Sequence, residues 1–139
     1  MTVRLRPHHL LCLLTYAGKG YSVDFTQNYD AIARRLSQGE SILIVDGPDD
    51  ICVPLLADAD AHCRRESVIE RDRAAADDVG RLVKATIRAG LTLEITGERL
   101  GVLRSAFVRG HTRAACSGCE WNELCSAIAS SGFVGTRVT

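Results

Sequence analysis

The spacing of apolar residues predicts a mainly helical protein. In the stretch before Gly39 they recur every three or four positions, which places them on one face of a helix. These apolar residues are Phe25, Tyr29, Ile32 and Leu36. The same reasoning predicts further helices from Pro7 through the leucines that follow it and over residues 67–89. Another is predicted after a cap at Thr96, and a short last one after a cap at Asn122, to about Ser130.

Two short stretches are predicted as strands. Residues 42–45 form an apolar, largely β-branched run that closes on an Asp-Gly-Pro turn, as expected of a buried strand. Residues 91–96 alternate apolar and polar positions, so a second strand is predicted there, although an extended loop fits the same pattern. We therefore expect a mainly α fold, or α+β with one or two short strands, as a single domain over residues 1–139.

Composition excludes some classes of function. The chain has 17 Lys plus Arg and 17 Asp plus Glu, so it has no net charge with which to attract nucleic acid or an anionic membrane. No apolar stretch approaches the roughly 20 residues needed to cross a bilayer. We therefore expect a cytoplasmic protein that binds neither nucleic acid nor membrane. In a reducing cytosol, the six cysteines are expected as thiols or metal ligands rather than disulfides.

Three of the cysteines are clustered in the segment CSGCEWNELC at residues 116–125. Cys116 and Cys119 form a C-x-x-C pair, whose tight turn lets two sulfurs bind one metal. Cys125 is predicted in the first turn of the last helix, where the positive end of the helix dipole stabilises a thiolate. Trp121 is expected to shield one side of the site from water. The segment is therefore predicted to bind a metal.

A metal held by three cysteines usually has a fourth ligand, and Cys52 and Cys63 are the candidates for it. Three clustered cysteines with a distant fourth are closer to iron–sulfur ligation than to structural zinc, which more often uses two C-x-x-C pairs. An iron–sulfur cluster of the 4Fe-4S type is the leading interpretation. Zinc is the alternative cofactor, and buried or redox-active thiols without a metal are the third interpretation.

Basic residues directly precede the cysteine segment. An iron–sulfur cluster bound by four thiolates is negatively charged, so Arg109, His111 and Arg113 are predicted to lie beside it and donate hydrogen bonds. For each of them, a solvated position in a loop is the competing interpretation.

Two adjacent histidines stand at the start of the first predicted helix. His8 and His9 precede Cys12 by four and three residues, so either can share a helix face with that thiol, as a metal ligand or as a general acid or base. The leucines around Cys12 favour a core position for it instead. Acidic residues at 46–50, just before Cys52, could bind a divalent cation, although Asp and Gly are also common in turns.

Several long blocks of the sequence, taken in order, resemble a known family. These blocks are RLRPHHLLCLLTYAGKGYS, IVDGPDDIC, the HC of residues 62–63, SVIERD, CSGCEWNELC and GFVGTR. They resemble domain of unknown function 1284, a family of small bacterial and archaeal proteins, over nearly the whole chain. The resemblance implies a suspected iron–sulfur cluster, for which the candidate ligands are Cys52, Cys63, Cys116, Cys119 and Cys125. It does not decide between Cys52 and Cys63 as the fourth ligand.

An iron–sulfur protein is therefore the expected function. With four thiolate ligands the cluster would serve electron transfer or redox sensing with an unknown redox partner. With three, one iron would stay open to act on an unknown small-molecule substrate, with His8 or His9 as proton donor. The alternative function is a structural zinc protein that binds a partner. Whether the protein is an enzyme is left open at this point.

Overall fold

The computed structural model describes residues 2–18, 22–46, 49–53, 66–112 and 122–139. Within these ranges the chain forms five helices and three short strands, which confirms the predicted mainly helical fold. The strands are β1 (Thr2–Leu5), β2 (Ser41–Ile44) and β3 (Thr92–Leu93), and the helices are α1 (His9–Thr15), α2 (Val23–Ser37), α3 (Glu66–Val83), α4 (Gly97–Val108) and α5 (Asn122–Ser130). None of the helices in the described ranges combines the length and apolar composition of a membrane-spanning segment.

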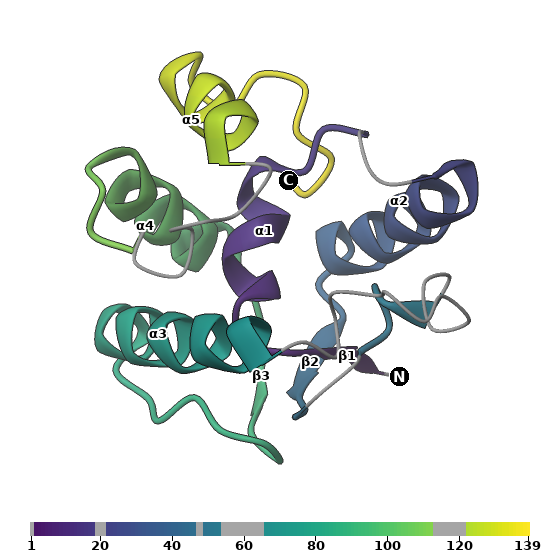
Figure 1. Ribbon diagram of the computed structural model, residues 1–139. Helices are drawn as coiled ribbons and strands as arrows, with labels where there is room; N and C mark the ends of the chain where they lie inside the picture. Colours follow the sequence, from purple (N-terminus) through teal and green to yellow (C-terminus); the bar gives the residue numbers. More distant parts are fainter. Residues whose placement is uncertain (1, 19–21, 47–48, 54–65, 113–121) are drawn as a thin grey trace.

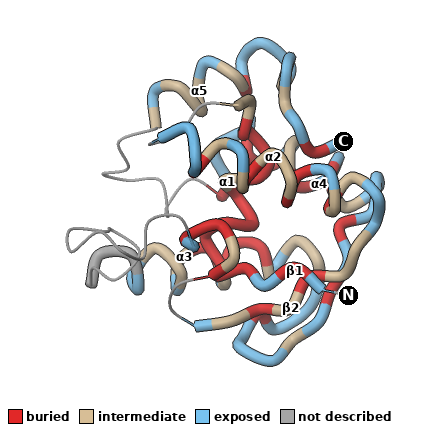
Figure 2. The backbone as a smooth tube through the Cα atoms, turned by 90° about the vertical axis from the view of Figure 1, so that its right-hand side faces the viewer, coloured by how far each residue is buried: buried red, intermediate tan, exposed pale blue. Residues whose placement is uncertain are grey.

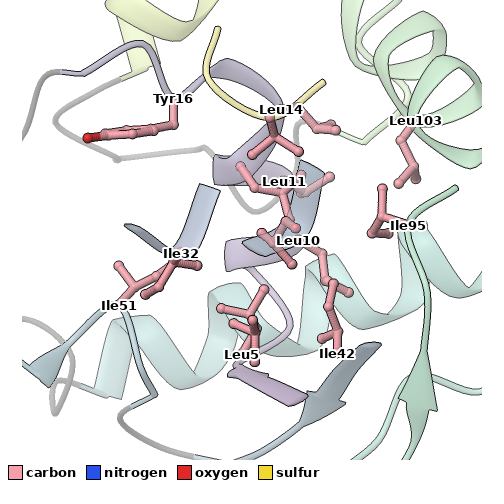
Figure 3. Packing of buried hydrophobic residues seen from close by; sticks show 14 of the residues in the cluster. Leu5, Leu10, Leu11, Leu14, Tyr16, Ile32, Ile42, Ile51, Ile95 and Leu103 are labelled. Atoms are coloured by element: carbon pink, nitrogen blue, oxygen red, sulfur yellow. The ribbon is translucent and has the colours of Figure 1, made fainter. Parts of the chain in front are cut away.

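Helix α1 occupies the centre of the fold, between α2 on one side and α3, α4 and α5 on the other (Figure 1). Every residue of α1 except Cys12 is buried. Figure 3 shows Leu10 and Leu11 in one cluster with Leu5 and Ile42 from the sheet. Burying a leucine side chain stabilises a fold by roughly 2 kcal/mol. The short α1 is therefore held by the apolar side chains that surround it.

The three strands form one small sheet in the order β1-β2-β3, with β1 parallel to β2 and β2 antiparallel to β3. Strand β1 was not predicted from the sequence. Its residues alternate between exposed and buried positions, with Val3 and Leu5 inside, but four residues give only a weak pattern. Leu5 pairs with Ile44, so the end of β1 lies beside the loop that follows β2. This pairing brings the start of α1 close to residues 49–52.

Helix α3 is shorter than the sequence predicts, because it ends at Val83 rather than near residue 89. Lys84 has a φ of 56°, in the left-handed region, and the backbone N–H of Ala85 then donates to the carbonyl of Gly80. A Cβ on Gly80 would lie 2.7 Å from the Ala85 carbonyl oxygen, so the close turn requires glycine there. Ile87 is buried, as predicted, but from the returning segment and not from the helix.

The C-terminal residues are attached to the end of α1. The guanidinium of Arg104, in α4, donates hydrogen bonds to the carbonyls of Leu14 and Val138, and the backbone N–H of Arg137 donates to the carbonyl of Tyr16. Val138 is buried. Figure 2 shows the buried positions, in red, in the interior around α1. These contacts fix the chain that follows α5 and hold α5 against α1.

Candidate functional site

Two histidine–aspartate pairs lie side by side at the start of α1. Nδ1 of His8 is 2.6 Å from Oδ1 of Asp72, and Nδ1 of His9 is 2.6 Å from Oδ2 of Asp49. The two imidazole rings are tilted against each other, with centroids 4.3 Å apart. The potential metal-ligating atoms of His8, His9 and Cys12 all lie within 4.8 Å of one another. The shared face that the sequence predicts for these three residues is therefore present.

Asp49 is almost fully buried and accepts hydrogen bonds at both carboxylate oxygens. Oδ2 accepts from the backbone N–H of Arg6 at 2.8 Å and from His9, while Oδ1 accepts from the backbone N–H groups of Ile51 and Cys52 at 3.1 and 3.2 Å. Burial acts to raise the pKa of Asp49, but the neighbouring His9 and these hydrogen bonds outweigh it and lower the pKa. The carboxylate thus organises the loop and orients His9 at the same time.

Asp72, from α3, performs the same role for His8. Its Oδ2 accepts from Nε and Nη2 of Arg6, both at 2.9 Å, and its Oδ1 accepts from the backbone N–H of His8 at 3.1 Å as well as from the ring. Arg6 is fully buried. Burial acts to raise the pKa of Asp72, but the hydrogen bonds from His8 and Arg6 lower it. Sequence reasoning missed both Arg6 and Asp72.

The environment of His8 keeps its imidazole neutral near pH 7. The pKa of His8 is lowered to about 4, mainly by burial and secondly by the neighbouring His9. Asp72 acts in the opposite direction but does not outweigh them. An ionised carboxylate can only accept a hydrogen bond, so the proton of the neutral ring is on Nδ1. Nε2 of His8 therefore carries the lone pair, which is the form of histidine that binds metals.

The described cysteines approach this region from three separate parts of the chain. Cys12 belongs to α1, and Cys52 follows Asp49 and is fully buried, with its sulfur in the group of potential ligand atoms formed with His9 and Asp49. Cys52 is disulfide-bonded, whereas the sequence predicted thiols or metal ligands. Cys125, in α5, has its sulfur 3.1 Å from the hydroxyl of Thr15, which donates to it. Thr15 ends α1, so the cysteines gather along that helix.

Tyr29 adds a buried hydroxyl to the same region. Its ring stacks on Tyr16 with centroids 3.7 Å apart, and only 4% of the residue is exposed. Among the described residues, its hydroxyl has no hydrogen-bond partner. The pKa of Tyr29 is raised well above its usual value by burial, followed by the charges of Cys12 and Asp49. The sequence placed Tyr29 on the apolar face of its helix and did not indicate that its hydroxyl would be buried in this region.

The other residues selected from the sequence are not part of this arrangement. Arg109 follows the last residue of α4 and is exposed, and His111 is exposed in the turn after it. No hydrogen bond to a described cysteine is found for either residue, so their predicted contact with a cluster stays a prediction. The remaining predicted site residues lie outside the described residues: Cys63, Arg113, Cys116, Cys119 and Trp121.

The lowered pKa of His8 predicts that the fold loses stability when the pH is lowered. In the metal-free protein, the unfolded chain binds a proton at His8 near its usual pKa of 6.5, whereas the folded chain binds it only near about 4. The free energy of unfolding should therefore fall as pH drops through this window, by up to roughly 3 kcal/mol. Urea unfolding curves between pH 7 and pH 4 would measure this loss.

Replacing His8 with glutamine should remove most of this pH dependence, because glutamine does not titrate. The exposed His111 offers a matched control, since His111→Gln should leave the dependence unchanged. The lowered pKa values of Asp49 and Asp72 also destabilise the fold on acidification, but at pH values below the window of His8. An undiminished loss of stability in His8→Gln would contradict the assignment.

Comparisons with known proteins give one family. Residues 20–125 match the family model described as "Protein of unknown function (DUF1284)". No curated protein and no solved structure matches the chain.

Proposed function

We propose that this chain, which belongs to the DUF1284 family, is an iron–sulfur protein. The proposed ligands are the cysteines of the segment at 116–125, with Cys52 or Cys63 as the fourth. A bound cluster would supply electron transfer or, with one iron left open, a Lewis acid. The proposal requires cysteines from distant parts of the chain to lie against the same part of the fold.

The observation that carries the proposal is the approach of Cys52 and Cys125 to the same helix. Cys52 belongs to a group of potential ligand atoms with His9, at the start of α1, and Cys125 accepts a hydrogen bond from Thr15, at its end. Both sulfurs thus meet α1 although they are far apart in the sequence. A hydroxyl that donates to a cysteine sulfur is also a usual means of stabilising a negatively charged cluster and adjusting its potential.

The chemistry of the donors fits an iron–sulfur cluster and also fits zinc. Thiolates are soft ligands that bind both, and the buried position of Cys52 keeps water away from a bound centre. Cys52 is disulfide-bonded in the structure, so a cluster or a zinc ion would bind it only after reduction. In the proposed loaded protein, Cys52 is a reduced thiolate. Zinc therefore stays the alternative cofactor, in a protein that binds a partner.

The same disulfide favours a second candidate function, which is thiol–disulfide exchange without a metal. Cys52 is bonded to another cysteine, and a disulfide that opens and closes would itself be a two-electron redox centre. This function needs no iron, so metal analysis separates it from the first.

Anaerobic purification, followed by visible absorption and by iron, zinc and sulfide analysis of one sample, tests the proposal. A brown protein with equal amounts of iron and sulfide is expected. Cys125→Ser should lose most of the iron and the colour, whereas Cys12→Ser, at a cysteine outside the proposed ligand set, should keep them. A colourless protein with stoichiometric zinc and no sulfide would contradict the proposal, as would a metal-free protein whose Cys52 disulfide is reduced and reformed reversibly.

A further inference from the structure

Three potential ligands that the proposed cluster does not use lie together at the start of α1. The ligand atoms of His8, His9 and Cys12 are within 4.8 Å of one another, and both histidines are buried. Ligand atoms on a tetrahedral zinc ion are on the order of 3.5 Å apart, because metal–nitrogen and metal–sulfur bonds are about 2.0 and 2.3 Å long. Small side-chain rotations would therefore bring all three atoms onto one ion.

A second group of potential ligands, His9 with Asp49 and Cys52, is less suited to a metal. The two oxygens of Asp49 already accept four hydrogen bonds, and three of these come from backbone N–H groups. Cys52 is already a candidate ligand of the proposed iron–sulfur centre. Asp49 is thus placed to orient a ligand rather than to act as one, and His9 remains available to the first group.

The two carboxylates hold both imidazoles in the arrangement common around bound metals. Asp72 and Asp49 each accept from Nδ1 of one histidine, which leaves the two Nε2 atoms to ligate. Both carboxylates are fixed by further donors, including the guanidinium of Arg6 on Asp72. Two carboxylates and one guanidinium therefore surround the two imidazoles, and a Cys12 thiolate would add a negative charge beside them. A divalent cation would offset the charge of that thiolate.

The hydroxyl of Tyr29 is an independent sign of a missing ligand. It is buried and has no hydrogen-bond partner among the described residues. A buried hydroxyl without a partner is costly, so a bound group that accepts its proton would stabilise the fold. Burial first, and then the charge of Cys12, raise the pKa of Tyr29, so the thiol acts electrostatically on this hydroxyl. The sulfur of Cys12, or a water bound to a metal beside it, would supply the acceptor.

From these contacts we propose that His8, His9 and Cys12 form a second metal site, for a divalent transition metal of the zinc type, with Asp72 and Asp49 as positioning residues. Three protein ligands leave a fourth position open, as in zinc sites that bind a water or a substrate. The site is distinct from the proposed iron–sulfur centre because none of its ligands belongs to that set.

Zinc binding followed through the imidazole nitrogens tests the site without any substitution. The full-length chain, freed of metal and reduced, would be titrated with zinc while long-range ¹H–¹⁵N spectra of the histidine rings are recorded. The expected result is a shift of Nε2 of His8 and His9 with the first equivalents of zinc, and no shift for the exposed His111. Zinc binding that leaves the His8 and His9 nitrogens unchanged would overturn the proposal.

Substitutions then separate this site from the cysteine centre. Asp72→Asn should weaken zinc binding at the histidines by about 10- to 100-fold, the usual effect of changing the partner of a ligating histidine. Asp50→Asn, at a carboxylate that pairs with Arg4 on the surface, should not. Equal effects of the two substitutions would contradict a positioning role for Asp72. Circular dichroism spectra of each variant would confirm that the fold is retained.

Cys12→Ser and Cys125→Ser give the decisive comparison. With cobalt as the probe, Cys12→Ser should remove the sulfur-to-metal absorption of the site that contains the histidines. Cys125→Ser should keep the zinc-dependent shifts of the histidine nitrogens even if the variant loses iron. Loss of those shifts would contradict the proposal that the two sites are separate. A protein without iron or sulfide that still shows the histidine shifts would refute the proposed function and support this site.

Discussion

Asp49→Ala is expected to lower the free energy of unfolding by about 4 kcal/mol. The carboxylate accepts four hydrogen bonds in a buried position, from the ring of His9 and from the backbone N–H groups of Arg6, Ile51 and Cys52. Alanine leaves all four donors without this acceptor, and each unpaired buried group costs about 1–3 kcal/mol unless water replaces the acceptor. Urea unfolding of the metal-free protein at pH 7 measures the loss.

The neighbouring residue provides the control for this prediction. Asp50 also accepts from a backbone N–H and from an arginine, but its partner Arg4 is mostly exposed. Asp50→Ala should therefore cost only about 1 kcal/mol. Asp49→Asn should fall between the two alanine variants, since the amide oxygen still accepts part of the hydrogen bonds while the amide nitrogen faces a donor. Similar losses for Asp49→Ala and Asp50→Ala would show that the buried contacts of Asp49 contribute little.

Arg6→Met is expected to lower the free energy of unfolding by about 3 kcal/mol, because it breaks a buried ion pair from one side. The guanidinium is fully buried and donates twice to Asp72. Methionine fills much of the same space but, among the described residues, leaves the carboxylate with His8 as its remaining side-chain partner. The loss is again measured by urea unfolding at pH 7.

The titration of His8 tests whether the loss in Arg6→Met has this electrostatic cause. The charge of Arg6 helps to lower the pKa of His8, so the methionine variant should show a pKa above about 4 by NMR titration. Arg6→Lys keeps a positive charge but not the two-point hydrogen bond with Asp72. It should lose stability while the pKa of His8 stays close to its original value. A pKa that is unchanged in Arg6→Met would contradict the assigned coupling.

The helices and strands predicted correctly from the sequence are those with a clear run or spacing of apolar residues. The apolar spacing in α2 and the leucines of α1 indicated helices, and the run at 42–45 indicated β2, because these patterns reflect burial directly. Strand β1 is too short for its alternation to be distinguished from chance. The predicted end of α3 was wrong, because the apolar spacing of the helix continues to the buried Ile87 although the chain has already turned at Lys84.

The candidate site was predicted in part, for a similar reason. The spacing of His8, His9 and Cys12 is local, so the sequence indicated a shared helix face, and the structure contains it. Asp72 was missed because it lies among other charged residues in α3, where nothing in a single sequence distinguishes a partly buried, paired carboxylate from a solvated one. Such a partner is selected by tertiary packing. The same holds for Tyr29, which has the sequence pattern of an ordinary core residue.

The contacts of α1 also bear on how the chain folds during its synthesis. His9, His8 and Thr15 find their partners 40, 64 and 110 residues further along the sequence. A ribosome that has produced only the first third of the protein therefore exposes the leucines of α1 without the elements that cover them. Such distant contacts form slowly and leave apolar surface open to aggregation. We expect α1 to be bound by chaperones on nascent chains until α3, α4 and α5 have emerged.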